Sequence, residues 1–251
     1  MTDRAYRSVV HVALSVFRAL DVRLEVAGRE HIPATGGGVV VINHTGYLDF
    51  ALAGVPFWRA HRRLVRFMAK KEVFEHRVSG PLMRAMHHIP VDRAAGAASF
   101  RAAIEALRAG ELVGVFPEAT ISRSFCLKEF KSGAARMART AGVPLIPLTL
   151  WGSQRVWTKA RKPTVRGARH VPISITIGAP LRPGRGDEAN TELIAVMNRL
   201  LDETRARYPD LPGDDPWWVP AHLGGTAPTP ERAAELDAEE QVERARRRES
   251  S

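Results

Sequence analysis

Short runs of aliphatic and β-branched residues recur through the central part of the chain and predict the strands of a sheet. The clearest run, Val39 to Ile42, follows consecutive glycines and is apolar at every position, as expected for a strand buried on both faces. Further runs of the same character cover residues 64–69, 89–91, 112–116, 145–150 and 173–177. These runs predict a sheet whose strands are covered on both sides.

Between these runs, apolar residues recur at the spacing of a helix. Residues 97–109 and 130–141 both show this period, and they stop at Gly110 and Gly142, a common signal for the end of a helix. Residues 188–207 form a similar amphipathic pattern. Helices that alternate with apolar strands predict an α/β domain with a mostly parallel central sheet flanked by helices.

The first part of the chain, residues 1–30, predicts an amphipathic helical segment. Tyr6, Val9, Ala13 and Phe17 share one helical face, and basic residues lie largely on the other. The apolar face either lies in a membrane interface or packs against the domain core. No apolar run reaches about 18 residues, so we expect no transmembrane helix. Polar interruptions argue against a signal peptide, so we expect a retained segment.

The end of the chain, residues 209–251, differs from the rest and is predicted to be a tail on an α/β domain of residues 31–208. Six prolines break regular structure, and the charged stretch from Glu231 is either a solvated helix or disordered. Trp217 and Trp218 either clamp back onto the domain, which we favour, or lie at a membrane interface.

Composition narrows the class of partner. The formal net charge is +10 at pH 7, which favours polyanions: nucleic acid, an anionic membrane face, or phosphorylated and CoA-type substrates. The basic clusters contain only Phe67 and Trp157 for base stacking, so we expect no nucleic acid partner. The single cysteine, Cys126, excludes an internal disulfide, and no Cys/His zinc spacing is present, so we expect no metal.

The segment directly after the first predicted strand, Asn43 to Asp49, carries the clearest candidate chemistry. It reads NHTGYLD, and α/β folds place reactive side chains where a strand ends. Histidine is the natural base near neutral pH, and a carboxylate that accepts from one ring nitrogen leaves the other free to take a proton. If the turn runs into a helix, Asp49 returns toward His44. This spacing alone also suits a structural histidine at a strand end.

Three further segments follow in order: IPVDR at 89–93, FPEATIS at 116–122 and VPLIPL at 143–148, with FKSGA at 130–134 before the last. With these blocks, residues 30–178 resemble the PlsC-type glycerolipid acyltransferase family, the 1-acyl-sn-glycerol-3-phosphate acyltransferases. That family carries an NHxxxxD block, a block ending in Arg, an FPEGTRS-like block and a VPxxPV-like block in the same order. The wording of MHHIPVDR and FPEATIS is most similar to actinobacterial members.

The resemblance implies a role for each matching residue. His44 would be the general base and Asp49 its partner. Arg93 would bind the phosphate of the acceptor, while Glu118, with Thr120 beside it, would shape the acceptor pocket.

Lys131 would be a second phosphate contact. This chain departs from the family where Gly-Thr-Arg after the glutamate becomes Ala119-Thr120-Ile121. Arg123 is the candidate replacement for the missing arginine, and the acceptor's identity stays open.

The resemblance also implies a reaction and a place. A fatty acyl group would move from acyl-CoA or acyl carrier protein, as co-substrate, to the sn-2 hydroxyl of 1-acyl-sn-glycerol 3-phosphate, giving phosphatidate. The enzyme would need no cofactor and would bind the cytoplasmic, anionic face of the membrane as a peripheral or monotopic protein. The alternative is another acceptor, such as glycerol 3-phosphate, a lysophospholipid or a glycolipid. A more distant alternative is a non-catalytic protein that binds polyanions or membranes.

Overall fold

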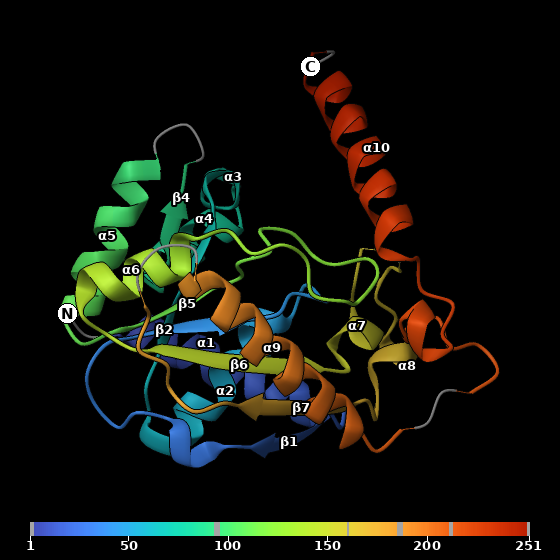
Figure 1. The fold of residues 1–251 in the computed structure, drawn as a ribbon, viewed down its shortest axis with the longest axis horizontal. Helices are drawn as coiled ribbons and strands as arrows, with labels where there is room; N and C mark the ends of the chain where they lie inside the picture. Colours follow the sequence, from blue (N-terminus) through green and yellow to red (C-terminus); the bar gives the residue numbers. More distant parts are fainter. Residues whose placement is uncertain (1–2, 93–95, 160, 185–187, 211–212, 250–251) are drawn as a thin grey trace.

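A central sheet lies between two layers of helices in the computed structural model, which describes residues 3–92, 96–159, 161–184, 188–210 and 213–249 (Figure 1). Within these residues the sheet has the strand order β1-β7-β6-β2-β5-β3-β4. Neighbouring strands are parallel except β6 and β7, so β1 and β7 run against the other five. The strands are β1 (Arg23–Ala27), β2 (Gly38–Ile42), β3 (Val65–Lys70), β4 (Ile89–Val91), β5 (Leu112–Val115), β6 (Leu145–Trp151) and β7 (Pro172–Ile177).

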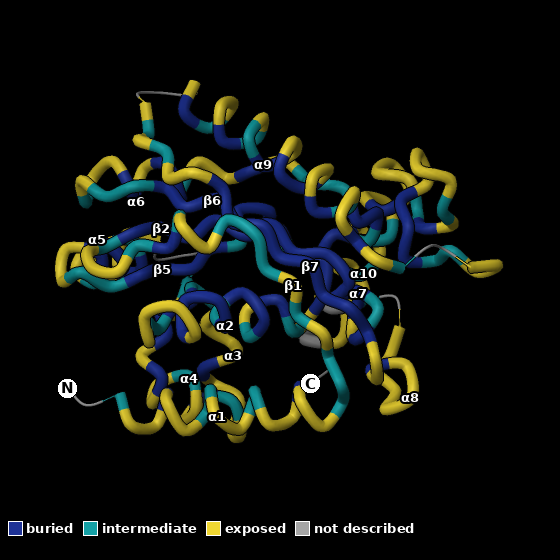
Figure 2. The backbone as a smooth tube through the Cα atoms, turned by 90° about the horizontal axis from the view of Figure 1, so that it is seen from below, coloured by how far each residue is buried: buried dark blue, intermediate teal, exposed yellow. Residues whose placement is uncertain are grey.

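Helices cover both faces of the sheet because its central strands are apolar on both sides. α1 and α2 lie on one side of the sheet and α5, α6 and α9 on the other (Figure 2). Val40 and Ile42 of β2 pack with residues of α1 and α2, whereas Val39 and Val41 pack with residues of α5, α6 and α9. The helices are α1 (Arg4–Ala19), α2 (Asp49–His61), α3 (Lys71–Glu75), α4 (Ser79–Ala85), α5 (Gly96–Arg108), α6 (Gly133–Ala141), α7 (Ser153–Val156), α8 (Val165–Ala168), α9 (Glu188–Ala206) and α10 (Pro230–Glu249), with 3₁₀ turns η1 (Arg29–His31) and η2 (Ala221–Leu223).

The predicted fold class is confirmed: the sheet is mostly parallel and helices flank it. All six apolar runs are strands, and the three predicted helices of the domain are α5, α6 and α9. Several elements were not predicted, among them β1 and α2. Edge strand β1 pairs only with β7 among the described strands, and α2 begins at Asp49, directly after the NHTGYLD turn.

Helix α1 packs on the sheet through one face and presents another outward. Tyr6 and Phe17 are buried, and the Tyr6 hydroxyl donates to the carbonyl of Val65 at 2.7 Å. Val12 and Val16 are 63% and 48% exposed. The core-packing alternative is therefore confirmed for the buried face. No helix in the described part of the chain combines the length and hydrophobicity needed to cross a bilayer.

The chain after Tyr208 returns to the body of the protein. Trp218 is buried and its ring lies 6.4 Å from that of Trp151 and 5.5 Å from that of Tyr208. The predicted clamp is confirmed for this tryptophan. The charged stretch from Glu231 was predicted to be either a solvated helix or disordered. In the structure it is helical and forms α10, which projects from the domain on the side of α7 (Figure 1).

Candidate functional site

Three parallel strands in the middle of the sheet, β2, β5 and β6, end at the same edge, and the loops that follow them build the site. Asn43, the first residue after β2, is fully buried. Its side-chain Nδ2 donates to the carbonyl of Leu150 at 3.0 Å, and its Oδ1 accepts from the Leu150 N–H at 2.8 Å. The amide side chain thus continues the β2–β6 ladder by one more peptide-like pair, which fixes the direction in which the next residue leaves the sheet.

That next residue is His44, and the structure brings its ring to Asp49. Nδ1 of His44 lies 2.9 Å from Oδ2 of Asp49. The same Oδ2 accepts hydrogen bonds from the backbone N–H groups of Thr45 (2.7 Å) and Gly46 (2.8 Å). Because Oδ2 acts as an acceptor in all three contacts, Nδ1 carries the ring hydrogen and Nε2 keeps its lone pair. The expected proximity of the pair is confirmed.

Asp49 is fully buried at the first turn of α2, where the helix dipole favours a negative charge. The turn before it is pressed against the loop after β6. A Cβ atom on Gly46 would lie 2.8 Å from the Trp157 carbonyl oxygen, so only glycine fits there. The Thr158 hydroxyl donates to the carbonyl of Thr45 at 2.7 Å. The sequence therefore folds the turn into one shape, and that shape aims the carboxylate at His44.

Glu118 ties the turn after β5 to this loop. Its Oε1 accepts from the backbone N–H of His44 at 2.9 Å, and its Oε2 accepts from that of Lys128 at 3.1 Å. The side chain is buried, and burial raises the pKa of Glu118 to about 8 although both hydrogen bonds act to lower it. The backbone N–H of Ser122 also donates to the carbonyl of His44, at 2.8 Å. Glu118 thus holds the site loops together.

The His44 ring is stacked and only partly covered. It lies on the ring of Phe116, with centroids 4.1 Å apart and planes 23° apart, and its side chain is 19% exposed. Stacking and the bond to Asp49 restrict both rotations of the ring. A histidine held in one tautomer, in one orientation and reachable from outside has the arrangement of a general base.

The remaining predicted residues are distributed around this core. Arg93 lies outside the described residues. Thr120 is half-buried, and Lys131 is exposed, with its backbone N–H donating to the Pro117 carbonyl at 3.0 Å. Arg123 is ion-paired with carboxylates of α10. In the part of the chain that is described, no group of three His, Cys, Asp or Glu side chains could hold a metal ion.

The two residues that depart from the FPEGTRS block, Ala119 and Ile121, differ in backbone conformation and burial. Ala119 adopts a left-handed backbone with φ of 58°, a conformation that glycine adopts at lower cost. Ile121 is buried, with 4% of its surface exposed. The position where an arginine was expected therefore points into the protein, and the basic side chain nearest in sequence is that of Arg123.

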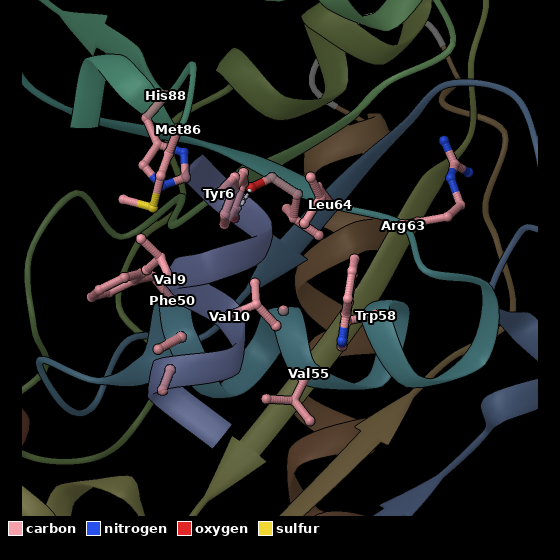
Figure 3. Close-up of a pocket in the computed structure, with 14 residues that line it drawn as sticks. Tyr6, Val9, Val10, Phe50, Val55, Trp58, Arg63, Leu64, Met86 and His88 are labelled. Carbon is pink, nitrogen blue, oxygen red and sulfur yellow. Dashed lines mark hydrogen bonds between the residues drawn. The ribbon is translucent and has the colours of Figure 1, made fainter. Parts of the chain in front are cut away.

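An apolar pocket lies between α1 and α2, beside the loop that carries Asp49 (Figure 3). It encloses about 470 Å³ of empty space, including its open mouth. Val9 and Val10 of α1 and Val55 of α2 line it, together with Phe50, the residue after Asp49. The sequence did not locate this pocket, because α2, which forms one of its walls, was not predicted.

Comparison with known proteins gives a consistent result. A family model described as Acyltransferase matches residues 23–151. The chain is 33% identical over 198 residues to a 1-acyl-sn-glycerol-3-phosphate acyltransferase of Bacillus subtilis, covering 76% of this chain and 90% of that protein. A protein of the same name from Limnanthes douglasii is 32% identical over 162 residues, which span 63% of this chain and only 54% of the plant protein.

The fold is also found among solved structures. The crystal structure of PlsC, the 1-acyl-sn-glycerophosphate acyltransferase from Thermotoga maritima, superimposes with a TM-score of 0.65 and 23% sequence identity, over 81% of each chain. This likeness extends the shared sheet and helix arrangement beyond the stretch that the family model matches.

Proposed function

Because the chain belongs to the PlsC-type glycerolipid acyltransferase family, we propose that it transfers a fatty acyl group from acyl-CoA or acyl carrier protein to the sn-2 hydroxyl of 1-acyl-sn-glycerol 3-phosphate. The product is phosphatidate. The observation that carries the proposal is the 2.9 Å contact between His44 Nδ1 and an Asp49 oxygen that two backbone amides hold in place.

In this mechanism His44 acts through Nε2. It takes the proton of the acceptor hydroxyl while the hydroxyl oxygen attacks the thioester carbonyl carbon. The C–S bond then breaks, an ester forms, and the thiolate leaves with the proton that His44 returns. Asp49 stabilises the positive imidazolium between these two transfers, and its fixed position keeps Nδ1 protonated throughout.

The pocket between α1 and α2 supports a long-chain substrate. Its walls are mainly apolar, so an acyl chain gains free energy there by leaving water. Phe50 links the pocket to the Asp49 turn, which places one wall a single residue from the proposed catalytic pair. We assign this pocket to an acyl chain.

The phosphate of the acceptor needs cations. Arg93 and Lys131 stay proposed contacts for it, as the family blocks imply. The buried side chain of Ile121, where the family has arginine, favours a second candidate function, in which the acceptor carries a different head group.

The test is an acceptor panel with one labelled acyl-CoA, comparing wild-type protein with His44→Ala. Loss of the base is expected to lower kcat by about 10²–10⁴ and to leave the fold intact. His61→Ala, at an exposed histidine at the end of α2, is the matched control and should retain full turnover. Near wild-type turnover of His44→Ala would eliminate the mechanism. Faster transfer to a phosphate-free acceptor would favour the second candidate.

We propose further that the outer face of α1 contacts an anionic membrane. Val12 and Val16 are exposed on α1, and Leu82 is exposed on α4, which lies on the same side of the sheet (Figure 2). Exposed apolar residues beside arginines suit a lipid surface. Val12→Asp with Val16→Asp should reduce sedimentation with anionic vesicles, whereas Val242→Asp, at an exposed valine of α10, should not. Equal sedimentation of all three proteins would refute this contact.

A further inference from the structure

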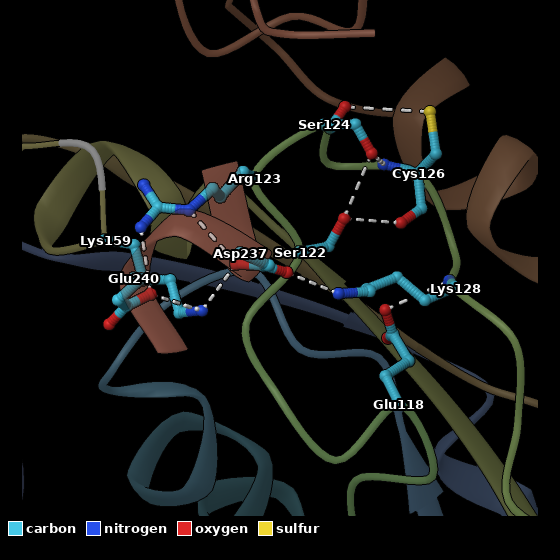
Figure 4. A network of polar contacts seen from close by, with 9 residues as sticks. All are labelled: Glu118, Ser122, Arg123, Ser124, Cys126, Lys128, Lys159, Asp237 and Glu240. Atoms are coloured by element: carbon cyan, nitrogen blue, oxygen red, sulfur yellow. Dashed lines mark hydrogen bonds and ion pairs between the residues drawn. The ribbon is translucent and has the colours of Figure 1, made fainter. Parts of the chain in front are cut away.

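Three basic side chains converge on two carboxylates of α10 (Figure 4). Asp237 receives Arg123 Nε at 3.1 Å, Lys128 Nζ at 2.6 Å and Lys159 Nζ at 2.8 Å. Glu240 receives Arg123 Nη2 at 3.0 Å and Lys159 Nζ at 3.1 Å. These three cations, the basic triad, are 10–31% exposed, so the contact is partly shielded from water.

Each cation of the basic triad belongs to a segment that is hydrogen-bonded to the His44 loop or to Glu118. Arg123 follows Ser122, whose N–H donates to the His44 carbonyl. Lys159 follows Thr158, whose hydroxyl donates to the Thr45 carbonyl. Lys128 donates its own N–H to Glu118, which in turn holds the N–H of His44. The basic triad is therefore built into the same framework as the proposed catalytic pair.

Helix α10 is held to this framework mainly by charge. Among the α10 side chains that the structure describes, Ala233 and Asp237 are buried and Leu236 is half-buried. Lys159 and Asp237 form the most shielded pair, whereas the Lys128 side chain is 31% exposed and its pair with Asp237 weakens with salt. The contact is thus of a kind that a competing anion can displace.

The charges match a phosphate. Three cations face two carboxylates, and a phosphomonoester carries about −1.5 to −2 at neutral pH with three acceptor oxygens. Arginine and lysine together supply directional and point-charge contacts for such a group.

We propose that Arg123, Lys128 and Lys159 form a phosphate-binding site beside the His44 loop, and that Asp237 and Glu240 of α10 occupy it in competition with phosphate. Helix α10 then acts as a latch whose release exposes the site. Assigning the phosphate to a substrate, either the acceptor lipid or the CoA donor, rests on the proposed function, whereas the anion site and its occlusion do not.

The first experiment measures binding of inorganic phosphate by calorimetry to the full chain. Asp237→Asn with Glu240→Gln should bind phosphate about five- to tenfold more tightly than wild type, because the competing carboxylates are removed. Glu235→Gln with Glu239→Gln makes the same change in net charge on the exposed face of α10, where both carboxylates pair with Arg232. This control should bind phosphate as wild type does.

Two further variants keep the result decisive. Glu240→Gln alone retains Asp237 and should give an intermediate gain, even if the double variant releases α10 completely. Adding Lys159→Ala to the double variant should abolish the gain, because it removes a cation that contacts both carboxylates. Unchanged phosphate affinity in the double variant, equal gains in the charge-matched control, or a gain that survives Lys159→Ala would each overturn the proposal.

Kinetics identify the source of the phosphate. In the double variant, a lower KM for 1-acyl-sn-glycerol 3-phosphate with unchanged KM for acyl-CoA would assign the site to the acceptor, and the reverse would assign it to the donor. If phosphate binds more tightly but no form of the protein transfers acyl groups, the proposed function fails and the site stands. If wild type transfers acyl groups but the double variant matches it in phosphate affinity and both KM values, the latch alone fails.

Discussion

The turn around Asp49 and the contact around Asp237 use the same chemical group in opposite ways. Asp49 is fully buried and held by backbone N–H groups of its own turn. Asp237 is buried as well, but it lies on a helix held through side-chain cations that are 10–31% exposed. Backbone donors fixed by the fold are insensitive to salt, whereas exposed ion pairs are screened and exchangeable. One carboxylate is therefore a permanent part of the site, and the other is replaceable.

The strongest way to break the Asp49 side of this comparison is Asp49→Asn. The amide cannot accept all three hydrogen bonds while stabilising an imidazolium at His44. We expect kcat to fall by about 10²–10⁴ with a smaller change in KM, measured with labelled acyl-CoA. Turnover above about a tenth of wild type would show that the pair is not catalytic. The Asp237 and Glu240 variants, by contrast, should retain kcat.

The next largest effect concerns the support beneath that turn. Asn43→Ala leaves the buried N–H and carbonyl of Leu150 without their partners, so the free energy of unfolding should fall by about 1–3 kcal/mol in urea titrations. Asn198→Ala, at an exposed asparagine of α9, is the control and should change it by less than about 0.5 kcal/mol. Equal losses in both variants would mean that the Asn43 pair is not what secures the loop.

A pH titration sharpens the comparison through Glu118. Burial raises its pKa from 4.5 to about 8, so between these values the unfolded chain has released a proton that the folded protein keeps. The folded state is therefore penalised progressively as pH rises through this window. The unfolding free energy of wild type minus that of Glu118→Gln should decrease from pH 4.5 to 8. A difference that stays constant with pH would contradict the raised pKa.

The smallest effect is expected at α10. Burial alone would raise the pKa of Asp237, but hydrogen bonds and charges from Lys128 and Lys159 lower it to about 2. Stability from this carboxylate is present above its ordinary 3.8 and is lost only as pH falls toward 2. Lowering the pH from 7 to 5 should not loosen α10.

Raising the salt concentration from about 50 to about 500 mM should speed trypsin cleavage within α10 about fivefold, as measured by mass spectrometry. Cleavage that is independent of salt would contradict a charge-held helix.

The sequence predicted most of the sheet because its strands are continuous aliphatic runs with few alternatives. It missed α2 because Gly54 and Pro56 interrupt that helix and apolar residues lie all around it, which hides the helical period. It missed β1 because an edge strand with Arg23 and Glu25 lacks the apolar continuity of the others. The local hydrophobic pattern predicts secondary structure well for strands that are buried on both faces. It fails for elements such as α2 and β1, whose structure depends on tertiary packing.

The site divides in the same way. The His44–Asp49 contact spans five residues within one turn, so the motif spacing anticipated it. The partners of Arg123 lie more than a hundred residues away, on a helix whose charged composition is typical of a solvated tail. The sequence identified Arg123 as a candidate phosphate contact, but no sequence pattern predicted that carboxylates of α10 pair with it. Arg93, the other nominated arginine, lies outside the described residues and stays a prediction.

Helix α1 cannot be treated as a removable module. Its Tyr6 hydroxyl caps the Val65 carbonyl, Phe17 belongs to the core, and Asp3 pairs with the buried guanidinium of Arg66 at 2.8 Å. Removing the first twenty residues would remove one wall of the pocket and would leave Arg66 without its ion pair to Asp3. In a vesicle sedimentation assay, such a shortened chain would sediment because it aggregates, so the assay would not measure membrane binding. To make this protein more soluble, the outward-facing side chains of α1 must therefore be replaced one at a time while the helix is kept.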